Sequence, residues 1–207
     1  MQAVTQHLIG HLGDTHRRVA QSGPISVYAW PDPDGDPDVS VLVTVGMSAL
    51  TQAAPPPGRC LVKEPRTELF ALAPKEHELA MAHVLADLAH YPERHSSWLH
   101  WFHNLPLGDT LIPGSTLSAV FTDVPYMGAH FATISRDHGR IDILWVIPIT
   151  DTERTYLKTY GFRRLLGTLR QRRPLPYRFL PFIHRRSRGR LTRRCSRLAS
   201  LAAELQG

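Results

Sequence analysis

The chain has 207 residues, of which 43% are hydrophobic, 8% aromatic and 20% charged. This balance is typical of a globular protein and excludes a wholly disordered chain. No apolar run reaches the roughly 18–20 residues that span a bilayer, and the first residues lack the apolar core of a signal peptide. Two cysteines, Cys60 and Cys195, cannot by themselves build a disulfide framework or a four-ligand zinc site. We therefore expect a cytoplasmic protein without a membrane span.

Charge is distributed unevenly along the chain. Residues 163–207 hold 13 of the 24 Lys and Arg residues but only one of the 18 acidic residues, Glu204, which gives this part a net charge of +12. The remaining 11 basic and 17 acidic residues give residues 1–162 a net charge of −6. The sequence therefore predicts a domain at residues 1–170 and an Arg-rich C-terminal extension at residues 171–207.

The first predicted elements are a peripheral helix and two strands. Apolar residues at rough helical spacing predict a helix within residues 2–21, and residues 25–30 form a strand candidate. Residues 31–38 are too rich in proline and glycine for regular structure, and we interpret them as an exposed acidic loop. Their alternating aspartates leave a calcium loop as an alternative, although the bidentate glutamate of such loops is missing. The β-branched run at residues 39–45 predicts an interior strand.

The middle of the chain contains the strongest helix signal. A strand is predicted at residues 66–72, and a helix follows at residues 75–91, closed by Pro92. The apolar residues expected on one face of this helix are Leu79, Ala82, Leu85, Ala86 and Ala89.

The second half of the domain is predicted to return to strands. Residues 116–122, 130–135 and 140–149 have strand patterns, and Thr150 with Glu153 has the spacing of a helix capping box. The order of strands, helix, strands and helix indicates an α+β fold with a mixed, largely antiparallel sheet and packed helices.

Two groups of residues suggest catalysis or metal binding. Ser48 follows a strand as a hydrolase nucleophile would, but Leu50 occupies the position where the nucleophile elbow needs a second glycine. The nearest set of metal ligands is His95, His100, His103 and Asp109. If this segment is extended, His100 and His103 point in opposite directions, whereas a helix would bring them together. Our prediction is a protein with no catalytic residue, metal or cofactor.

Four segments together resemble the suppressor of fused domain in its compact bacterial form. They are residues 43–48, residues 66–69, residues 107–111, and the apolar run at residues 144–150 followed by Glu153, which is the most specific. The resemblance covers roughly residues 25–170 and does not include the Arg-rich end. It implies an α+β domain that binds other proteins instead of catalysing a reaction, and, by analogy with bacterial members of the family, an immunity protein that neutralises a cognate toxin.

Aromatic side chains are the best candidates for a protein-binding surface. Aromatic anchors bury much area at low entropic cost, but they are also common core residues, as we expect for Trp145. The candidate partner-binding residues are Trp98, Trp101, Phe102 and Asp109. The acidic net charge of residues 1–162 favours a basic partner, such as a nuclease toxin.

The C-terminal arginines support an alternative function. A nucleic-acid-associated protein would use them to contact phosphate groups, and the candidate polyanion-binding residues are Arg185, Arg186, Arg193 and Arg194. Two other hypotheses remain open for this part of the chain: it contacts the acidic domain, or it is an incidental extension.

Overall fold

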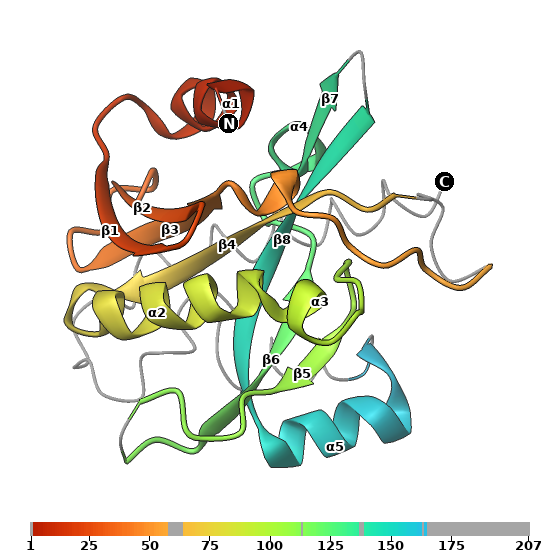
Figure 1. Cartoon of the computed structure of the whole chain (residues 1–207). Coiled ribbons are helices and arrows are strands. Elements are labelled where there is room, and N and C mark those ends of the chain that lie inside the picture. Colours follow the sequence, from red (N-terminus) through yellow and green to blue (C-terminus); the bar gives the residue numbers. More distant parts are fainter. Residues whose placement is uncertain (1, 58–63, 113, 137–138, 163, 165–207) are drawn as a thin grey trace.

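A mixed eight-stranded sheet forms the centre of the protein in the computed structural model, which describes residues 2–57, 64–112, 114–136, 139–162 and 164 (Figure 1). The strand order is β1-β2-β3-β4-β8-β6-β5, and β7 pairs with β8 outside this path. All pairings are antiparallel except that between β4 and β8. The strands are β1 (Arg17–Ser22), β2 (Ile25–Pro31), β3 (Val39–Val45), β4 (Thr67–Pro74), β5 (Asn104–Pro106), β6 (Leu117–Asp123), β7 (Thr133–Arg136) and β8 (Gly139–Thr150).

Five α-helices accompany this sheet within the described residues. Alpha-helical segments are α1 (Gln2–Leu12), α2 (Glu78–Ala89), α3 (Tyr91–Arg94), α4 (Ala129–Ala132) and α5 (Asp151–Tyr160). Two short 3₁₀ helices follow β3 and β4, at Met47–Ala49 and Lys75–His77. The expected α+β class with a largely antiparallel sheet is confirmed. No helix in the described ranges is both long enough and apolar enough to cross a membrane.

Alternate residues of the strands supply two separate cores, one on each face of the sheet. Val41 and Val43 of β3 belong to the core that contains Trp145, whereas Leu42 between them belongs to the other core. Helix α2 lies across the second core, as Figure 1 shows in front of the sheet. The first core is completed from helices α1, α4 and α5 by Val4, Leu8, Phe131 and Leu157.

The N-terminal part of the chain differs from the prediction. Residues 17–21, expected within a helix, belong to strand β1 and pair with β2 across a turn at Gly23. Helix α1 ends earlier, where Gly13 adopts a positive φ of 87° and its N–H donates to the carbonyl oxygen of Ile9 at 2.9 Å. Pairing with β2, a tertiary effect, therefore determines the structure of a segment that has little strand pattern of its own.

The helix predicted at residues 75–91 is divided, and one of its expected core residues is exposed. Leu79 is 57% exposed, because it lies in the first turn of α2 on the side away from the sheet. Glu78 faces inward instead, where its carboxylate accepts hydrogen bonds from Arg17 and Ser40. The predicted strand at residues 130–135 is also shorter, because α4 occupies its first residues.

The predicted capping box at the start of α5 is confirmed. The N–H of Glu153 donates to Oγ1 of Thr150 at 3.2 Å, and the N–H of Thr150 donates to Oε2 of Glu153 at 2.9 Å. Each side chain thus satisfies a backbone donor that the helix leaves unpaired. This cap fixes the direction in which the chain leaves β8.

Candidate functional site

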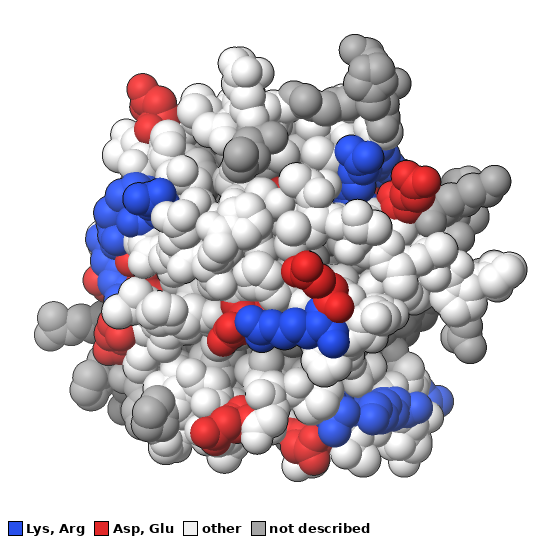
Figure 2. All heavy atoms as spheres, viewed as in Figure 1, with Lys and Arg blue, Asp and Glu red and all other residues white. Residues whose placement is uncertain are grey.

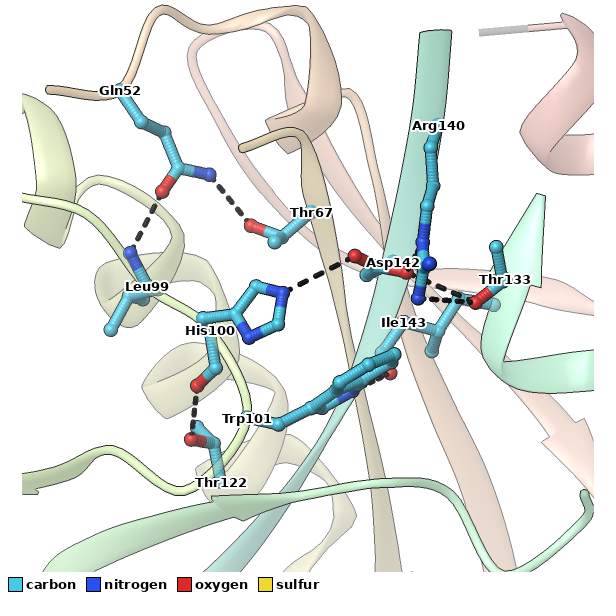
Figure 3. Close-up of polar contacts among 10 residues, drawn as sticks. All are labelled: Gln52, Thr67, Leu99, His100, Trp101, Thr122, Thr133, Arg140, Asp142 and Ile143. Atoms are coloured by element: carbon cyan, nitrogen blue, oxygen red, sulfur yellow. Dashed lines mark hydrogen bonds and ion pairs between the residues drawn. The ribbon is translucent and has the colours of Figure 1, made fainter. Parts of the chain in front are cut away.

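The segment at residues 98–103, here called the aromatic segment, lies between α3 and β5 and is tied to the sheet at its beginning by Gln52. The Gln52 side chain donates to Oγ1 of Thr67 in β4 at 2.7 Å, and its Oε1 accepts the N–H of Leu99 at 2.8 Å (Figure 3). Leu99 is fully buried in the core beneath α2. Because the side chains of Gln52 and Leu99 are both buried, these contacts fix the position of the start of the segment.

Thr122 of β6 holds the other end of the aromatic segment. Its hydroxyl donates to the carbonyl oxygen of His100 at 2.6 Å and accepts the N–H of His103 at 2.9 Å. The backbone of Thr122 also accepts the N–H of Phe102 at 2.7 Å. Thr122 is completely buried, so these bonds are shielded from water and define the turn at residues 100–103.

Trp101 packs against the start of β8. Its indole N–H donates to the carbonyl oxygen of Ile143 at 3.1 Å, and the guanidinium carbon of Arg140 lies 5.3 Å from the ring centroid (Figure 3). The side chain is half-buried and also contacts the core beneath α2. Trp101 therefore combines a structural contact on one side with a cation–π contact on the other.

An ionic cluster around Asp142 links the aromatic segment to β7 and β8. The Asp142 carboxylate accepts hydrogen bonds from Nε of Arg140 at 2.6 Å and from the hydroxyl of Thr133 at 3.0 Å, and its Oδ2 lies 3.3 Å from Nε2 of His100. Burial alone would raise the pKa of Asp142, but contacts with His100, Arg140 and Thr133 outweigh it and hold the pKa below its ordinary value. Asp142 is thus a buried, ionised anchor.

Phe102 has the most unusual conformation in the segment. Its φ angle is +69°, in the left-handed region that bulky residues rarely adopt, and its side chain is 43% exposed. The ring stacks on Phe162 with centroids 4.4 Å apart and an interplanar angle of 22°. A strained backbone therefore carries a large apolar side chain at the surface.

The histidines near the aromatic segment have separate partners. His95 packs on Tyr91 at a centroid distance of 4.4 Å, His100 faces Asp142, and His103 meets the edge of Trp98 at 4.3 Å. Burial lowers the pKa of His103, and His100 lowers it further. The part of the chain that the structure describes contains no group of three or more His, Cys, Asp or Glu side chains arranged to hold a metal ion.

The structure places the predicted partner-binding residues in two locations. Trp98, Trp101 and Phe102 share the aromatic segment, with the two tryptophans half-buried. Asp109 lies beyond β5 in an exposed turn, where its carboxylate accepts the N–H of Thr110 at 2.7 Å. The predicted polyanion-binding residues lie outside the described residues and are Arg185, Arg186, Arg193 and Arg194.

Ser48 belongs to a structural turn built around a buried carboxylate. Glu68 is fully buried and accepts hydrogen bonds from the hydroxyls of Thr44 and Ser48, both at 2.7 Å, and from the N–H groups of Gly46 and Ser48, both at 3.0 Å. Burial raises the pKa of Glu68, and these four bonds oppose the effect only in part. Gly46 has a φ of 119°, and an added Cβ would lie 2.5 Å from the carbonyl oxygen of Pro24.

Sequence reasoning missed the polar residues that hold the site together. Gln52, Thr122 and Arg140 carry no local signal for this role, because the residue of the aromatic segment that each contacts lies more than 20 positions away in the chain. Asp142 did have a signal, since it is an acidic residue inside an apolar strand, where a charge needs a partner.

These observations define an α+β domain with a mixed sheet and an anchored, partly exposed aromatic segment. The sequence model described as Suppressor of fused protein matches residues 21–178, which is more than half of the chain. The chain therefore belongs to the suppressor of fused protein family. No curated protein matches it.

Solved structures show the same fold at low sequence identity. A protein described as a suppressor of fused homolog, from Neisseria gonorrhoeae FA 1090, is 18% identical with a TM-score of 0.55, and the match covers 82% of this chain and 88% of that one. A chain of the Sufu–Fu complex is 16% identical with a TM-score of 0.59, over 82% and 83% of the two chains. Drosophila Suppressor of Fused is 19% identical with a TM-score of 0.52, over 71% of this chain and 38% of that larger one.

Proposed function

We propose that this protein is a non-catalytic protein-binding domain and that its aromatic segment contacts the partner. The observation that carries the proposal is the conformation of Phe102, which is exposed, strained and held by Thr122. Membership of the suppressor of fused family supports a binding role, and one similar fold comes from a complex between Sufu and Fu.

The energetics of Phe102 favour an interface over a purely structural role. A non-glycine residue in the left-handed region costs on the order of 1–3 kcal/mol, which glycine would avoid. A side chain that is 43% exposed recovers only part of its burial energy within the domain. Partner binding would bury the rest of the ring, as aromatic anchors do in interfaces.

The polar groups beside the aromatic segment and in the turn at Ser48 have structural partners that account for them without catalysis. Asp142 is neutralised by Arg140 and faces His100, while Ser48 donates to the buried Glu68. A nucleophilic serine would instead need a base that accepts its proton and a site for the substrate carbonyl. The proposal therefore assigns these groups to the support of the fold and of the aromatic segment.

The most specific form of the proposal is an immunity protein in the cytoplasm that neutralises a cognate toxin. It is supported by the family resemblance to compact bacterial domains, and it predicts that the toxin is encoded beside this protein. Co-expression with the neighbouring gene product tests it: the wild-type chain should rescue growth, and failure to rescue would remove the immunity assignment.

The second candidate function is nucleic-acid binding by the Arg-rich extension at residues 171–207. The observation in its favour is the net charge of +12 on residues 163–207, since arginine contacts with phosphates release condensed counterions. Affinity for nonspecific duplex DNA should then fall steeply with salt concentration and disappear when residues 174–207 are deleted. DNA binding by the truncated chain would contradict this assignment.

Site-specific photo-crosslinking in the native cell tests the binding proposal. A photoreactive phenylalanine analogue is placed at position 102 or, as a matched control, at Leu79, which is an exposed apolar residue on α2. We expect one discrete protein adduct from position 102 and none from position 79. The same adducts from both positions, or none from position 102, would contradict the use of the aromatic segment.

A further inference from the structure

The exposed aromatic area around Phe102 continues onto the end of α5. Phe102 stacks on Phe162, and Tyr160, two residues earlier, is 52% exposed and lies 4.6 Å from Tyr156 between ring centroids. We call Phe102, Tyr160 and Phe162 the aromatic surface. It combines the exposed ring of the aromatic segment with rings at the end of α5 and just beyond it.

Basic side chains flank this aromatic surface. The guanidinium carbon of Arg164 lies 5.8 Å from the centroid of Tyr160, and Lys158 is exposed in the last turn of α5. At the other end, Arg140 lies over Trp101, next to Phe102 in the chain. Bonds from Arg140 to Asp142 and Thr133 use two of the five N–H donors of a guanidinium group.

The carboxylates of the neighbouring elements either accept hydrogen bonds within the domain or lie at the far end of α5 from the aromatic surface. Asp142 is 3% exposed and paired with Arg140, and Asp123 accepts the N–H of Val124 at 2.8 Å. Asp151 and Glu153 lie at the opposite end of α5, where Asp151 pairs with Arg154. Figure 2 likewise shows basic side chains over α5 at the lower right of the molecule, with acidic ones toward the start of the helix. The basic side chains on the α5 side of the aromatic surface are therefore Lys158 and Arg164.

We propose that the aromatic surface binds an acidic segment of the partner protein, with one or more apolar side chains seated among Phe102, Tyr160 and Phe162. This inference rests on the proposed function. The apolar side chain covers the exposed rings, while neighbouring carboxylates of the partner face Lys158 and Arg164. The net charge of −6 on residues 1–162 favours a basic partner at long range, but the charges beside the contact surface favour an acidic one.

Two synthetic peptides with the same Phe and Leu residues test the inference, one with Glu and the other with Lys at all remaining positions. Fluorescence polarisation measures the binding of each to the full-length chain. We expect the acidic peptide to bind, the basic peptide not to bind, and the Phe102→Gly variant to lose the interaction.

Charge variants locate the contact. Replacing both Lys158 and Arg164 by glutamine should weaken the binding of the acidic peptide by roughly two- to tenfold, which is the effect expected for charge pairs at the rim of an interface. Replacing Arg18 and Lys75 together by glutamine is the matched control, because it also removes two exposed positive charges, one on β1 and one just after β4, and it should have no effect. Equal weakening by this control would show that the peptide responds to overall charge and would overturn the inference.

The result with the basic peptide separates this inference from the proposed function. Tighter binding of the basic peptide, abolished by Phe102→Gly, would overturn the acidic specificity but support partner binding at the aromatic segment. Acidic-peptide binding that is unaffected by Phe102→Gly, or the failure of both peptides to bind, would also overturn the inference. In either of these cases, crosslinking at position 102 still tests the proposed function independently.

Discussion

The N–H of Phe102 donates to the carbonyl oxygen of Thr122 at 2.7 Å, so a residue in a left-handed conformation is fixed to the buried C-terminal end of strand β6. The hydroxyl of the same threonine bonds to the backbone on either side of Phe102, at His100 and His103. One buried side chain thereby supports the most exposed aromatic ring of the segment. The hydrogen bonds from Thr122 therefore hold the proposed contact surface in a fixed position on the sheet.

Replacing Thr122 by valine should destabilise the protein and loosen the aromatic segment. The change keeps the shape of the side chain but leaves the carbonyl of His100 and the N–H of His103 without their partner, at a cost of about 1–3 kcal/mol. Thr122→Ser keeps the hydroxyl and should be less destabilised. Urea unfolding of both variants checks this, and a valine variant as stable as the wild type would show that the hydroxyl is dispensable.

Two substitutions at Phe102 separate its backbone strain from its side chain. Phe102→Gly and Phe102→Ala both remove the ring that stacks on Phe162, but only glycine also removes the left-handed strain. The glycine variant should therefore be more stable than the alanine variant by about 1 kcal/mol. Thermal unfolding measures the difference. An alanine variant that is as stable as the glycine variant, or more stable, would contradict the backbone strain assigned to position 102.

Substitutions of Glu68 should reveal its role in the turn at Gly46 and Ser48. Glu68→Ala leaves four buried donors without an acceptor and should cost several kcal/mol, on the order of 3–5. Glu68→Gln retains one oxygen acceptor and should be less damaging. Chemical denaturation of the two variants tests this order, and equal losses would mean that the amide oxygen of glutamine does not replace the carboxylate as an acceptor, which would contradict the expected order.

Asp142 should make stability depend on pH in the acid range. Its pKa in the folded protein is held below the ordinary value of 3.8, so its stabilising contribution is complete above that value and is lost as the pH falls through the folded pKa. Asp142→Asn should be less stable than the wild type at neutral pH, and the difference should shrink under acid. Urea unfolding as a function of pH measures this, and a difference that grows toward low pH would contradict the assigned direction.

Local sequence signals predicted much of the fold. The β-branched run of β3, the apolar run of β8 and the capping box at Thr150 and Glu153 are each determined by neighbouring residues. The helix predicted for residues 17–21 is wrong because the structure of strand β1 depends on pairing with β2. Leu79 was wrongly placed in the core because helical periodicity does not show where the first turn leaves the sheet.

The candidate site was only partly accessible from sequence. Composition identified Trp98, Trp101 and Phe102, because aromatic residues cluster there beside histidines and a proline. The positive φ of Phe102 has no sequence signature, since nothing in the residue type predicts a left-handed backbone. The anchoring of this segment by Thr122 and Asp142 depends on contacts between distant parts of the chain.

The binding proposal is tested most directly by measuring the affinity of the partner captured through position 102 for the wild-type chain and for the Phe102→Gly variant. The thermal stability of both chains is recorded in parallel. Loss of the aromatic anchor should weaken binding at least about tenfold, as for interface hot spots, while the melting temperature stays equal or rises. Unchanged affinity in a folded Phe102→Gly variant would contradict the proposal that the aromatic segment binds the partner.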